Sequence, residues 1–414
     1  MSELIKKNAS LDIEKTLRPY PESGPDETIS ISPAALSQLD PQDHLLIDVR
    51  DESSFSMGNI PGSRRISRED LLSGNHDLPK DKKIILYCMF GVLSLEAAKT
   101  LNAQGYNAAN LEGGYGRWLV QVMQQDADDR TRLDEIEKSL RKKFKKEIMS
   151  RFVRAINDYE LIQEGDRIAV CISGGKDSML MAKCFQELKR RNKFNFDLTF
   201  LVMNPGYTDV TLQMILNNAK LLNIPITMFE SDIFDAVYNI EKSPCYLCAR
   251  MRRGYLYSKA KELGCNKIAL GHHFDDVIET TLMSILYSGQ TQTMMPKLHS
   301  TNFEGMELIR PMYYIREADV KRWRDHNGLT FIRCACRFTD TCSVDESNPG
   351  ATGDSGSKRL EVKRLIAKLK ETNPHVETNL LRSMENIHLN AVLGYKKDGV
   401  KHSFLDSYET GSEV

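Results

Sequence analysis

Short apolar runs, each followed by a polar turn and a helical pattern, divide the chain into two regions built on one plan. In the first region the runs at 45–50 and 83–87 predict buried strands, and residues 94–102 predict a helix. Strands that alternate with helices favour a small parallel sheet covered by crossover helices. We therefore expect the first region to be an α/β domain.

The second region repeats this alternation on a larger scale. Apolar runs predict strands at 168–172, 198–203, 226–229 and 267–270, and residues 211–222 predict a helix. Ligands of such sheets bind outside the carboxyl ends of the strands. The turns that follow these strands therefore hold the candidate site residues.

Polar stretches set the expected domain boundaries. The first of them contains Pro-Tyr-Pro-Glu-Ser-Gly-Pro, and a later one is rich in Gly, Ser and Asp. The expected parts are a flexible leader at 1–27, a first α/β domain at 28–125, a basic helical linker at 126–151, a second α/β domain at 152–342, a flexible loop at 343–357, and two amphipathic helices with a tail at 358–414.

The turn Ser-Gly-Gly-Lys-Asp-Ser comes directly after the strand predicted at 168–172 and directly before a helical pattern. Glycines allow backbone N–H groups to approach an anion closely, and the helix adds the positive end of its dipole. The spacing differs from G-x-x-x-x-G-K-[ST], which disfavours an ordinary P-loop nucleotide hydrolase. The candidate ATP ligands of this phosphate loop are Ser173, Gly174, Gly175, Lys176, Asp177 and Ser178.

Two further strand ends add candidates to the same edge of the predicted sheet. One strand ends at Met203, and another leads into Gly-His-His-Phe-Asp-Asp. Carboxylates there suit Mg²⁺ or the positioning of a substrate, although a pair of helix-capping aspartates is the alternative. The candidates are Met203, Gly271 and His272 for ATP, and Asp275 and Asp276 for catalysis.

Composition narrows the class of protein. The chain has 414 residues, enough for two or three domains, and a net charge of −1, so any nucleic-acid surface must be local. We find no apolar signal segment and no run long enough to span a bilayer, which predicts a cytoplasmic protein without a membrane partner. In that compartment the nine cysteines indicate catalytic thiols or metal ligands rather than disulfides.

Cys88 follows the strand predicted at 83–87 and opens the segment Cys-Met-Phe-Gly-Val-Leu-Ser, which leads into the next helix. Backbone N–H groups at a helix N-terminus stabilise a thiolate. We therefore expect Cys88 to be a reactive thiol, and the alternative is a small buried residue.

A second group of cysteines has the spacing of metal ligands. Cys245 and Cys248 form a C-x-x-C, and Cys334 and Cys336 lie far downstream. Soft thiolates select zinc or an iron–sulfur cluster. The residues alone leave zinc, a cluster, a redox pair or no function open.

Basic residues gather in two places. Between residues 138 and 154 there are eight Lys or Arg against one Glu, and Arg250, Arg252 and Arg253 follow the C-x-x-C. Both groups are candidate tRNA contacts, because phosphate neutralisation carries most nucleic-acid affinity. A solvated helix face explains the first group equally well, and salt bridges to carboxylates explain the second.

Two parts of the chain resemble known families. The phosphate loop resembles the SGGxDS loop of the PP-loop pyrophosphatases, which adenylate a carbonyl oxygen and release pyrophosphate. The first domain resembles a rhodanese domain through Ile-Asp-Val-Arg at 47–50, Gly-Asn-Ile-Pro-Gly at 58–62, the loop from Cys88, and Gly-Gly-Tyr-Gly-Arg-Trp at 113–118. That resemblance implies that Cys88 carries sulfur as a persulfide. Leu93 stands where many members have Arg, which favours a persulfide from another protein over thiosulfate as donor.

Roughly residues 150–340 resemble the tRNA 2-thiocytidine synthetase family. The shared segments are C-x-L-C-A-R-x-R-R-G-x-L-Y at 245–257, K-I-A-L-G-H-H-x-D-D at 267–276 and M-x-P-K-L at 294–298. The resemblance implies a Rossmann-like sheet of the adenine nucleotide alpha hydrolase type, ATP and Mg²⁺. It also implies a four-iron four-sulfur cluster on Cys245, Cys248 and Cys334. Cys336 is the alternative third ligand, and zinc is the alternative metal.

Together these resemblances imply an ATP-dependent tRNA sulfurtransferase that converts ATP to AMP and pyrophosphate. Its expected substrate is C2 of a cytidine in the anticodon loop, with sulfur relayed from Cys88 through the cluster. A cysteine desulfurase is the expected persulfide donor, and a homodimer is compatible with the sequence. The alternatives are sulfur insertion into another tRNA base or a small molecule, and a non-catalytic sulfur carrier or redox sensor.

Overall fold

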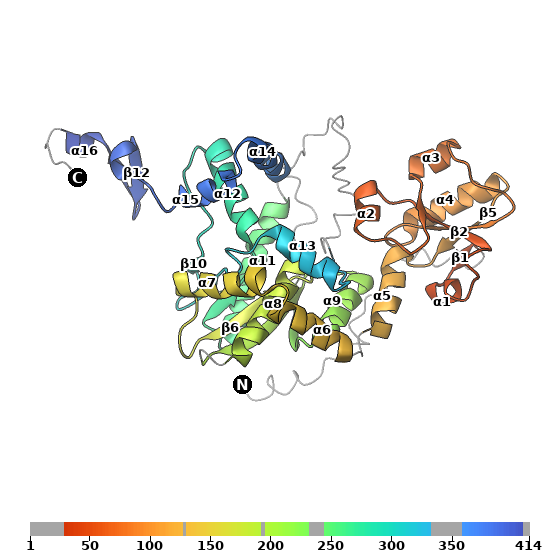
Figure 1. Cartoon of the computed structure of the whole chain (residues 1–414), viewed down its shortest axis with the longest axis horizontal. Helices are drawn as coiled ribbons and strands as arrows, with labels where there is room; N and C mark the ends of the chain where they lie inside the picture. Colours follow the sequence, from red (N-terminus) through yellow and green to blue (C-terminus); the bar gives the residue numbers. More distant parts are fainter. Residues whose placement is uncertain (1–28, 127–129, 192–194, 232–243, 333–357, 409–414) are drawn as a thin grey trace. The chain divides into compact units, whose positions relative to one another are not determined.

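The computed structural model describes residues 29–126, 130–191, 195–231, 244–332 and 358–408. Figure 1 labels the helices and strands along the chain. The chain divides into two compact units. The larger unit comprises Met1–Gly271 with Lys297–Thr352, and the smaller comprises His272–Pro296 with Gly353–Val414. Among the described helices, none has the length and apolar character needed to cross a membrane.

Five short parallel strands form the first sheet of the larger unit, in the order β1-β5-β4-β2-β3. The predicted strands at 45–50 and 83–87 are confirmed as β2 and β4, with small shifts at their ends. The strands are β1 (Ser30–Ile31), β2 (His44–Asp48), β3 (Arg64–Arg65), β4 (Lys83–Tyr87) and β5 (Asn107–Leu111).

Helices cover both faces of this sheet. Successive side chains of a strand point to opposite faces, so β4 contributes Ile84 and Leu86 to one apolar cluster and Ile85 and Tyr87 to the other. The helices are α1 (Pro33–Leu36), α2 (Glu52–Met57), α3 (Arg68–Ser73), α4 (Val92–Ala103) and α5 (Gly114–Asp126). Cys88 thus follows the central strand, whose last four residues are buried.

The basic segment is not one continuous α-helix. It consists of α6 (Arg130–Arg141), a short π-helical turn (Lys145–Met149) and α7 (Ser150–Asp158). Its apolar side chains Ile136, Leu140, Phe144 and Ile148 are buried in the same cluster as residues of the following strand. The segment is therefore packed into the second α/β domain.

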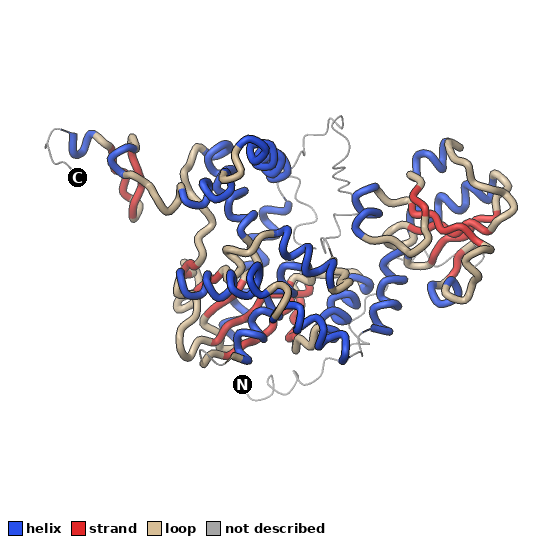
Figure 2. The backbone as a smooth tube through the Cα atoms, viewed as in Figure 1, coloured by secondary structure: helices blue, strands red, loops and turns tan. Residues whose placement is uncertain are grey.

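Six strands form the second sheet, in the order β10-β11-β9-β6-β7-β8. All neighbours are parallel except β10 and β11. The strands are β6 (Arg167–Ile172), β7 (Asp197–Asn204), β8 (Ile226–Glu230), β9 (Lys267–Ala269), β10 (Lys297–His299) and β11 (Glu307–Ile309). The helices of this domain include α8 (Lys176–Arg190), α9 (Asp209–Leu221), α11 (Pro244–Glu262) and α13 (Glu317–His326). Figure 2 shows helices around this sheet, as expected for an α/β domain.

The smaller unit contains mostly helices. They are α12 (Phe274–Ser288), α14 (Lys358–Thr372), α15 (Val376–Arg382) and α16 (Leu405–Tyr408). The two helices predicted in the tail are present as α14 and α15. A hairpin of β12 (Gly394–Lys397) and β13 (Val400–Ser403) follows them, and the hydrophobic pattern did not predict it.

Candidate active site

The phosphate loop lies at the carboxyl end of β6, where the sequence places it. Ser173 N–H donates to Ser178 Oγ at 3.1 Å, and Ser178 Oγ donates to the carbonyl of Gly175 at 3.0 Å. Gly175 is the N-cap of α8, with no side-chain hydrogen bond to cap the helix. The turn is therefore closed by its own serines, and the helix begins without a capping side chain.

Gly174 adopts a left-handed backbone conformation, with φ of 84°. A Cβ built on it would lie 2.6 Å from Ile215 Cγ1 and 2.6 Å from Ile332 Cδ1. Two apolar side chains from distant parts of the domain thus press on the loop, and only glycine meets both the conformation and the close approach.

Lys176 is held by two carboxylates. Its Nζ lies 2.9 Å from Asp177 Oδ2 and 3.4 Å from Glu317 Oε1. Glu317 begins α13 and also pairs with Lys321 at 3.1 Å. Glu317 was not among the residues predicted for the site, although it follows Arg316 in a charged pair just before a helical pattern.

Gly271 follows β9 and Met203 lies near the end of β7, and these two strands flank β6. A Cβ on Gly271 would lie 3.2 Å from the backbone nitrogen of Ser178, so this glycine backbone packs against the start of α8. Met203 is only 4% exposed and belongs to an apolar cluster with Leu201 and Cys171. The side chain of Met203 is therefore part of the core.

The remaining strand-end candidates lie in the smaller unit, at the start of α12. His273 is the N-cap of this helix, and its Nδ1 accepts from Asp276 N–H at 3.3 Å. His273 N–H donates in return to Asp276 Oδ2 at 3.0 Å. Asp276 also pairs with Arg359 at 3.4 Å. The capping role that the sequence left open is therefore present for Asp276, while Asp275 lies outside this capping box.

A buried carboxylate follows one turn later on α12. Burial raises the pKa of Glu279, and Arg359, whose Nε lies 3.1 Å from Glu279 Oε2, opposes that rise. Arg359 thus joins the start of α14 to two acidic residues of α12. His272, the first residue of the smaller unit, directly precedes the N-cap.

Two polar groups of the same loop lie against the thiol of Cys88. Gly91 N–H donates to Cys88 Sγ at 3.1 Å, and the Ser94 hydroxyl lies 3.4 Å from the same sulfur. Ser94 Oγ also accepts from Cys88 N–H at 3.1 Å and donates to Asn110 Oδ1 at 2.7 Å. Ser94, which was not among the residues predicted for the site, connects the thiol to β5.

The glycines that follow β5 hold this loop in place. A Cβ on Gly114 would overlap the carbonyl oxygen of Cys88. Tyr115 N–H donates to that carbonyl at 2.8 Å, and Gly116 N–H donates to Met89 O at 2.9 Å. The Cys88 loop therefore packs backbone to backbone against the start of α5.

The outer edge of the same loop is apolar. Val92 and Leu93 are 50% and 49% exposed, while the thiol-bearing Cys88 is 5% exposed. The position where many rhodanese domains carry Arg is thus an exposed Leu in this chain.

The predicted metal ligands lie largely outside the described part of the molecule. Cys245 and Cys248 are in the first turn of α11, and their side chains are not among those described. Residues three apart on a helix lie on one face, so the backbone is compatible with two ligands to one metal. Cys334 and Cys336 lie outside the described residues.

The arginines after the C-x-x-C also lie on α11. Arg252 is half-buried and Arg253 is exposed, whereas the side chain of Arg250 is not among those described. The described residues therefore leave the role of this group as a prediction.

Three other cysteines are packing residues. Cys171, Cys184 and Cys265 are buried and free of disulfides. Burial raises the pKa of all three thiols, that of Cys171 to about 12. None of them is therefore a ready nucleophile.

Comparison with family models supports both predicted folds. A rhodanese-like domain model matches residues 32–121, and a PP-loop domain model matches residues 140–336. The PP-loop match includes the closed turn at the end of β6, and the rhodanese match includes the Cys88 loop.

Two solved structures align with parts of the chain. The U34-tRNA thiolase NcsA from Methanococcus maripaludis, solved with its [4Fe-4S] cluster, aligns with a TM-score of 0.45 and 20% identity. That alignment covers 59% of this chain and 80% of the other. A rhodanese homologue from Thermus thermophilus aligns with a TM-score of 0.19 and 34% identity, covering 21% of this chain and 95% of the other.

Curated relatives share the second domain at higher identity. A protein of Syntrophotalea carbinolica is 38% identical over 237 residues, which cover 56% of this chain and 86% of the relative. A protein of Coxiella burnetii is 37% identical over 254 residues, which cover 59% of this chain and 91% of the relative. Both are named tRNA-cytidine(32) 2-sulfurtransferase. Since these alignments span most of each relative, the chain belongs to the tRNA-cytidine(32) 2-sulfurtransferase family.

Proposed function

We propose that this protein is an ATP-dependent tRNA sulfurtransferase that converts a cytidine of the anticodon loop into 2-thiocytidine. The observation that carries the proposal is the closed turn at the end of β6, which presents Lys176 beside the uncapped start of α8. An uncapped helix start with a neighbouring cation is suited to polyphosphate. The names of the relatives supply the acceptor.

Adenylation is the first step. O2 of the cytidine attacks the α-phosphorus of ATP, a new P–O bond forms, and the bond to pyrophosphate breaks. Lys176 offsets the charge that builds up on the phosphate oxygens. Its charge is balanced by Asp177 and Glu317, and bound phosphate would replace part of that balance.

Carboxylate oxygens are the ligands that Mg²⁺ prefers. Asp276 is engaged in the capping box of α12, so we assign the Mg²⁺ or base-positioning role to Asp275 and retain Asp177 at the loop. The ion would neutralise charge on the leaving pyrophosphate. Gly271 and His272 connect this acidic segment to the strand end and are the residues that we expect to line the ATP site.

Sulfur insertion is the second step. A sulfur nucleophile attacks C2 of the adenylated base, the C2–O bond breaks, and AMP leaves. We propose that Cys88 brings this sulfur as a persulfide received from a donor such as a cysteine desulfurase. Because the outer sulfur of a persulfide must gain two electrons to become sulfide, the relay also needs a thiol reductant.

The thiolates of Cys245, Cys248 and one of Cys334 and Cys336 form a donor set that suits an iron–sulfur cluster. Three protein ligands leave one position for sulfur, which is the chemistry such a cluster would supply here. An anaerobic absorbance spectrum with iron and zinc counts per chain tests this assignment. Zinc without iron would contradict it.

The acceptor is bound through basic residues. We propose Arg250, Arg252 and Arg253 as tRNA contacts because they lie on the same helix as the first two cysteines. Charge on this helix would bring the anticodon loop towards the sulfur source.

Nucleoside mass spectrometry of tRNA from a deletion strain tests the function. We expect 2-thiocytidine to disappear, to return with the wild-type gene, and to stay absent with Lys176→Ala. Undiminished 2-thiocytidine in the deletion strain would contradict the assigned acceptor, and loss of another thiolated nucleoside would identify a different one. If Lys176→Ala restores the product while Cys88→Ala does not, the protein is a sulfur carrier instead.

A further inference from the structure

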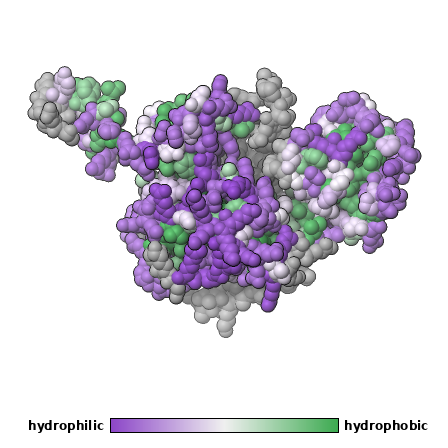
Figure 3. All heavy atoms as spheres, viewed as in Figure 1, coloured by the Kyte–Doolittle hydropathy of each residue, from purple (hydrophilic) through white to green (hydrophobic). Residues whose placement is uncertain are grey.

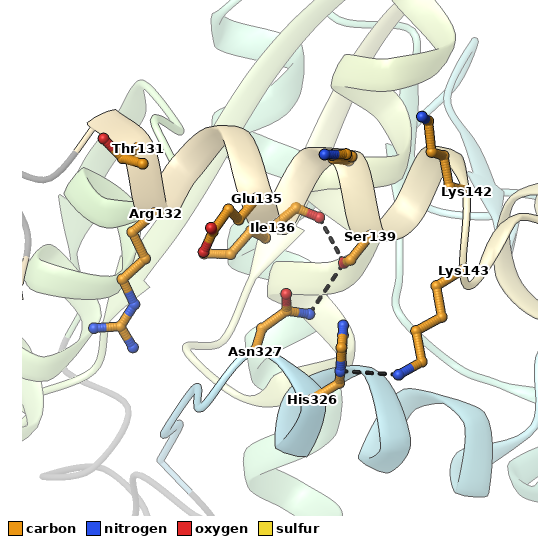
Figure 4. Close-up of a pocket in the computed structure, with 10 residues that line it drawn as sticks. Thr131, Arg132, Glu135, Ile136, Ser139, Lys142, Lys143, His326 and Asn327 are labelled. Carbon is orange, nitrogen blue, oxygen red and sulfur yellow. Dashed lines mark hydrogen bonds between the residues drawn. The ribbon is translucent and has the colours of Figure 1, made fainter.

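A second candidate binding surface lies in the basic segment, away from the phosphate loop. A hollow of about 810 Å³ opens between α6 and α13 (Figure 4). Its lining contains four cationic side chains, one histidine and one carboxylate, which are Arg132, Lys138, Lys142, Lys143, His326 and Glu135. The hollow is therefore strongly biased towards an anionic ligand.

The floor of the hollow is rigid. Asn327 Nδ2 donates to Ser139 Oγ at 3.1 Å and to Trp323 O at 2.7 Å, and Ser139 Oγ donates to Ile136 O at 2.7 Å. Ile136 and Trp323 beneath these bonds are buried. The two helices that carry the cations are thus fixed to each other inside one unit.

Ion pairs distinguish two lysines of the hollow from the arginines of the same segment. Arg141 pairs with Glu137 and Glu187, and Arg151 pairs with Asp319. In contrast, Lys138 and Lys142 have no ion pair with any residue that the structure describes, and both are exposed. These two lysines therefore bring to the hollow positive charge that no described carboxylate balances.

Like charges at these positions oppose folding unless a ligand compensates for them. Lys138 and Lys142 are four residues apart, which brings cations together on one helix face. Lys143 is held differently, because its Nζ donates to His326 Nδ1 at 3.1 Å. The helix dipole of α6 favours a cation in the last turn of that helix. It does not explain why four cationic side chains line one hollow.

The row of cations is too long for a single phosphate. From Arg132 to Lys142 the segment advances about 15 Å at 1.5 Å per residue. Successive phosphates of a nucleic-acid strand extend over such a distance, whereas a free phosphate or pyrophosphate contacts only part of it. The surface around α6, α8 and α13 is also predominantly hydrophilic (Figure 3), as expected for a phosphate-backbone contact.

We propose that the α6–α13 hollow binds the phosphate backbone of the substrate tRNA. The proposal rests on the proposed function, which supplies tRNA as the substrate. It assigns the basic segment a positioning role, because backbone contacts fix register and orientation without reading the base.

The test measures binding of an unmodified in vitro tRNA transcript to the full-length protein over a series of salt concentrations. For Lys138→Glu/Lys142→Glu we expect at least about tenfold weaker binding and a salt slope smaller by about 1 to 2, since each lost phosphate contact removes about 0.7–0.9 from that slope. The control Lys145→Glu/Lys146→Glu changes the net charge of the same segment by the same amount. It alters two lysines outside the hollow and retains Lys138 and Lys142. It should leave the slope unchanged.

A variant that is expected to bind tRNA more tightly tests whether misfolding explains the weaker binding of the lysine variants. Glu135→Gln removes the one carboxylate of the lining and leaves the cations in place. We expect it to tighten tRNA binding about threefold at low salt, the direction in which removal of a like charge acts on an anionic ligand. A folding defect would weaken binding instead.

Several outcomes would overturn the proposal. One is an unchanged dissociation constant and salt slope in Lys138→Glu/Lys142→Glu, and another is an equal loss of tRNA binding in the control variant. A third is binding of inorganic pyrophosphate at the hollow that leaves the affinity for tRNA unchanged. Failure of the proposed function is distinguishable from these. In that case wild-type protein would bind the transcript through Lys138 and Lys142 but form no thiolated nucleoside.

Discussion

The Cys88 loop and the phosphate loop are built on the same backbone device. Each follows a buried strand in the middle of a parallel sheet, β4 in one case and β6 in the other. Each contains a left-handed glycine, Gly91 with φ of 82° and Gly174 with φ of 84°. Each leads into a helix whose N-cap makes no side-chain hydrogen bond. Backbone N–H groups at the helix start therefore remain available to an anion.

The two loops differ in where that anion comes from. In the Cys88 loop, Gly91 N–H is directed at a sulfur that belongs to the loop itself. In the phosphate loop, Ser178 closes the turn and Lys176 pairs with two carboxylates. The anion of this loop must therefore be supplied by a ligand. The same strand-turn-helix backbone is therefore suited to a sulfur carried on Cys88 in the first sheet and to a bound polyphosphate in the second.

The largest expected effect separates activation from sulfur transfer. Lys176→Ala should lower tRNA-dependent pyrophosphate release on the order of 100- to 1,000-fold, the usual cost of removing a group that stabilises transition-state charge. Persulfide loading of Cys88, followed by mass spectrometry of the intact protein, should be unchanged. Loss of both activities would mean that the two loops do not function independently.

Substitution of Cys88 tests the sulfur-carrying loop in the same way. Cys88→Ala should reduce thiolation from a persulfide donor protein by about 100-fold, because a carrier fused to its acceptor domain acts at high effective concentration. Pyrophosphate release should continue, and millimolar inorganic sulfide should restore product. Thiolation at the wild-type rate from the donor protein would remove Cys88 from the pathway.

Two glycine substitutions compare how tightly the loops are packed. Both Gly114 and Gly174 have positive φ, which costs other residues about 1–2 kcal/mol. A Cβ on Gly114 would meet the Cys88 backbone, which cannot move aside, whereas a Cβ on Gly174 would meet the ends of two isoleucine side chains. We expect Gly114→Ala to lower the free energy of unfolding about 1–3 kcal/mol more than Gly174→Ala, by the cost of overpacking. Urea unfolding, with tryptophan fluorescence as the signal, measures both, and equal losses would contradict the comparison.

The smallest effect concerns the pH dependence of stability beneath the phosphate loop. Burial raises the pKa of the Cys171 thiol to about 12, so the folded state holds this proton more tightly than the unfolded state does. The resulting stabilisation is complete below the unfolded pKa of about 8.5 and is lost as the pH rises towards the folded value. Between pH 7.5 and 9.5, wild type should lose about 1 kcal/mol more than Cys171→Ala in urea unfolding. Parallel pH profiles of the two proteins would contradict this.

Local patterns sufficed for the strands whose residues are apolar and β-branched, and for the turns that follow them. They failed for β5, whose sequence Asn-Ala-Ala-Asn-Leu has low strand propensity and which forms because it pairs with β1 and β4. They also missed the π-helical break near Phe144, because the apolar spacing continues through it. Pairing and packing with distant segments outweighed the local preference in both cases.

The sequence by itself determined which residues could do chemistry. A glycine-rich turn after an apolar run, a cysteine after another, and their spacing to the following helices are local properties, because the backbone of a strand-turn-helix unit follows from neighbouring residues. Only the tertiary structure decided their partners. It brought Glu317 to Lys176 and Arg359 to Asp276, and it left Lys138 and Lys142 without carboxylate partners among the described residues. These pairings join residues far apart in the chain, and no local pattern encodes which carboxylate reaches which cation.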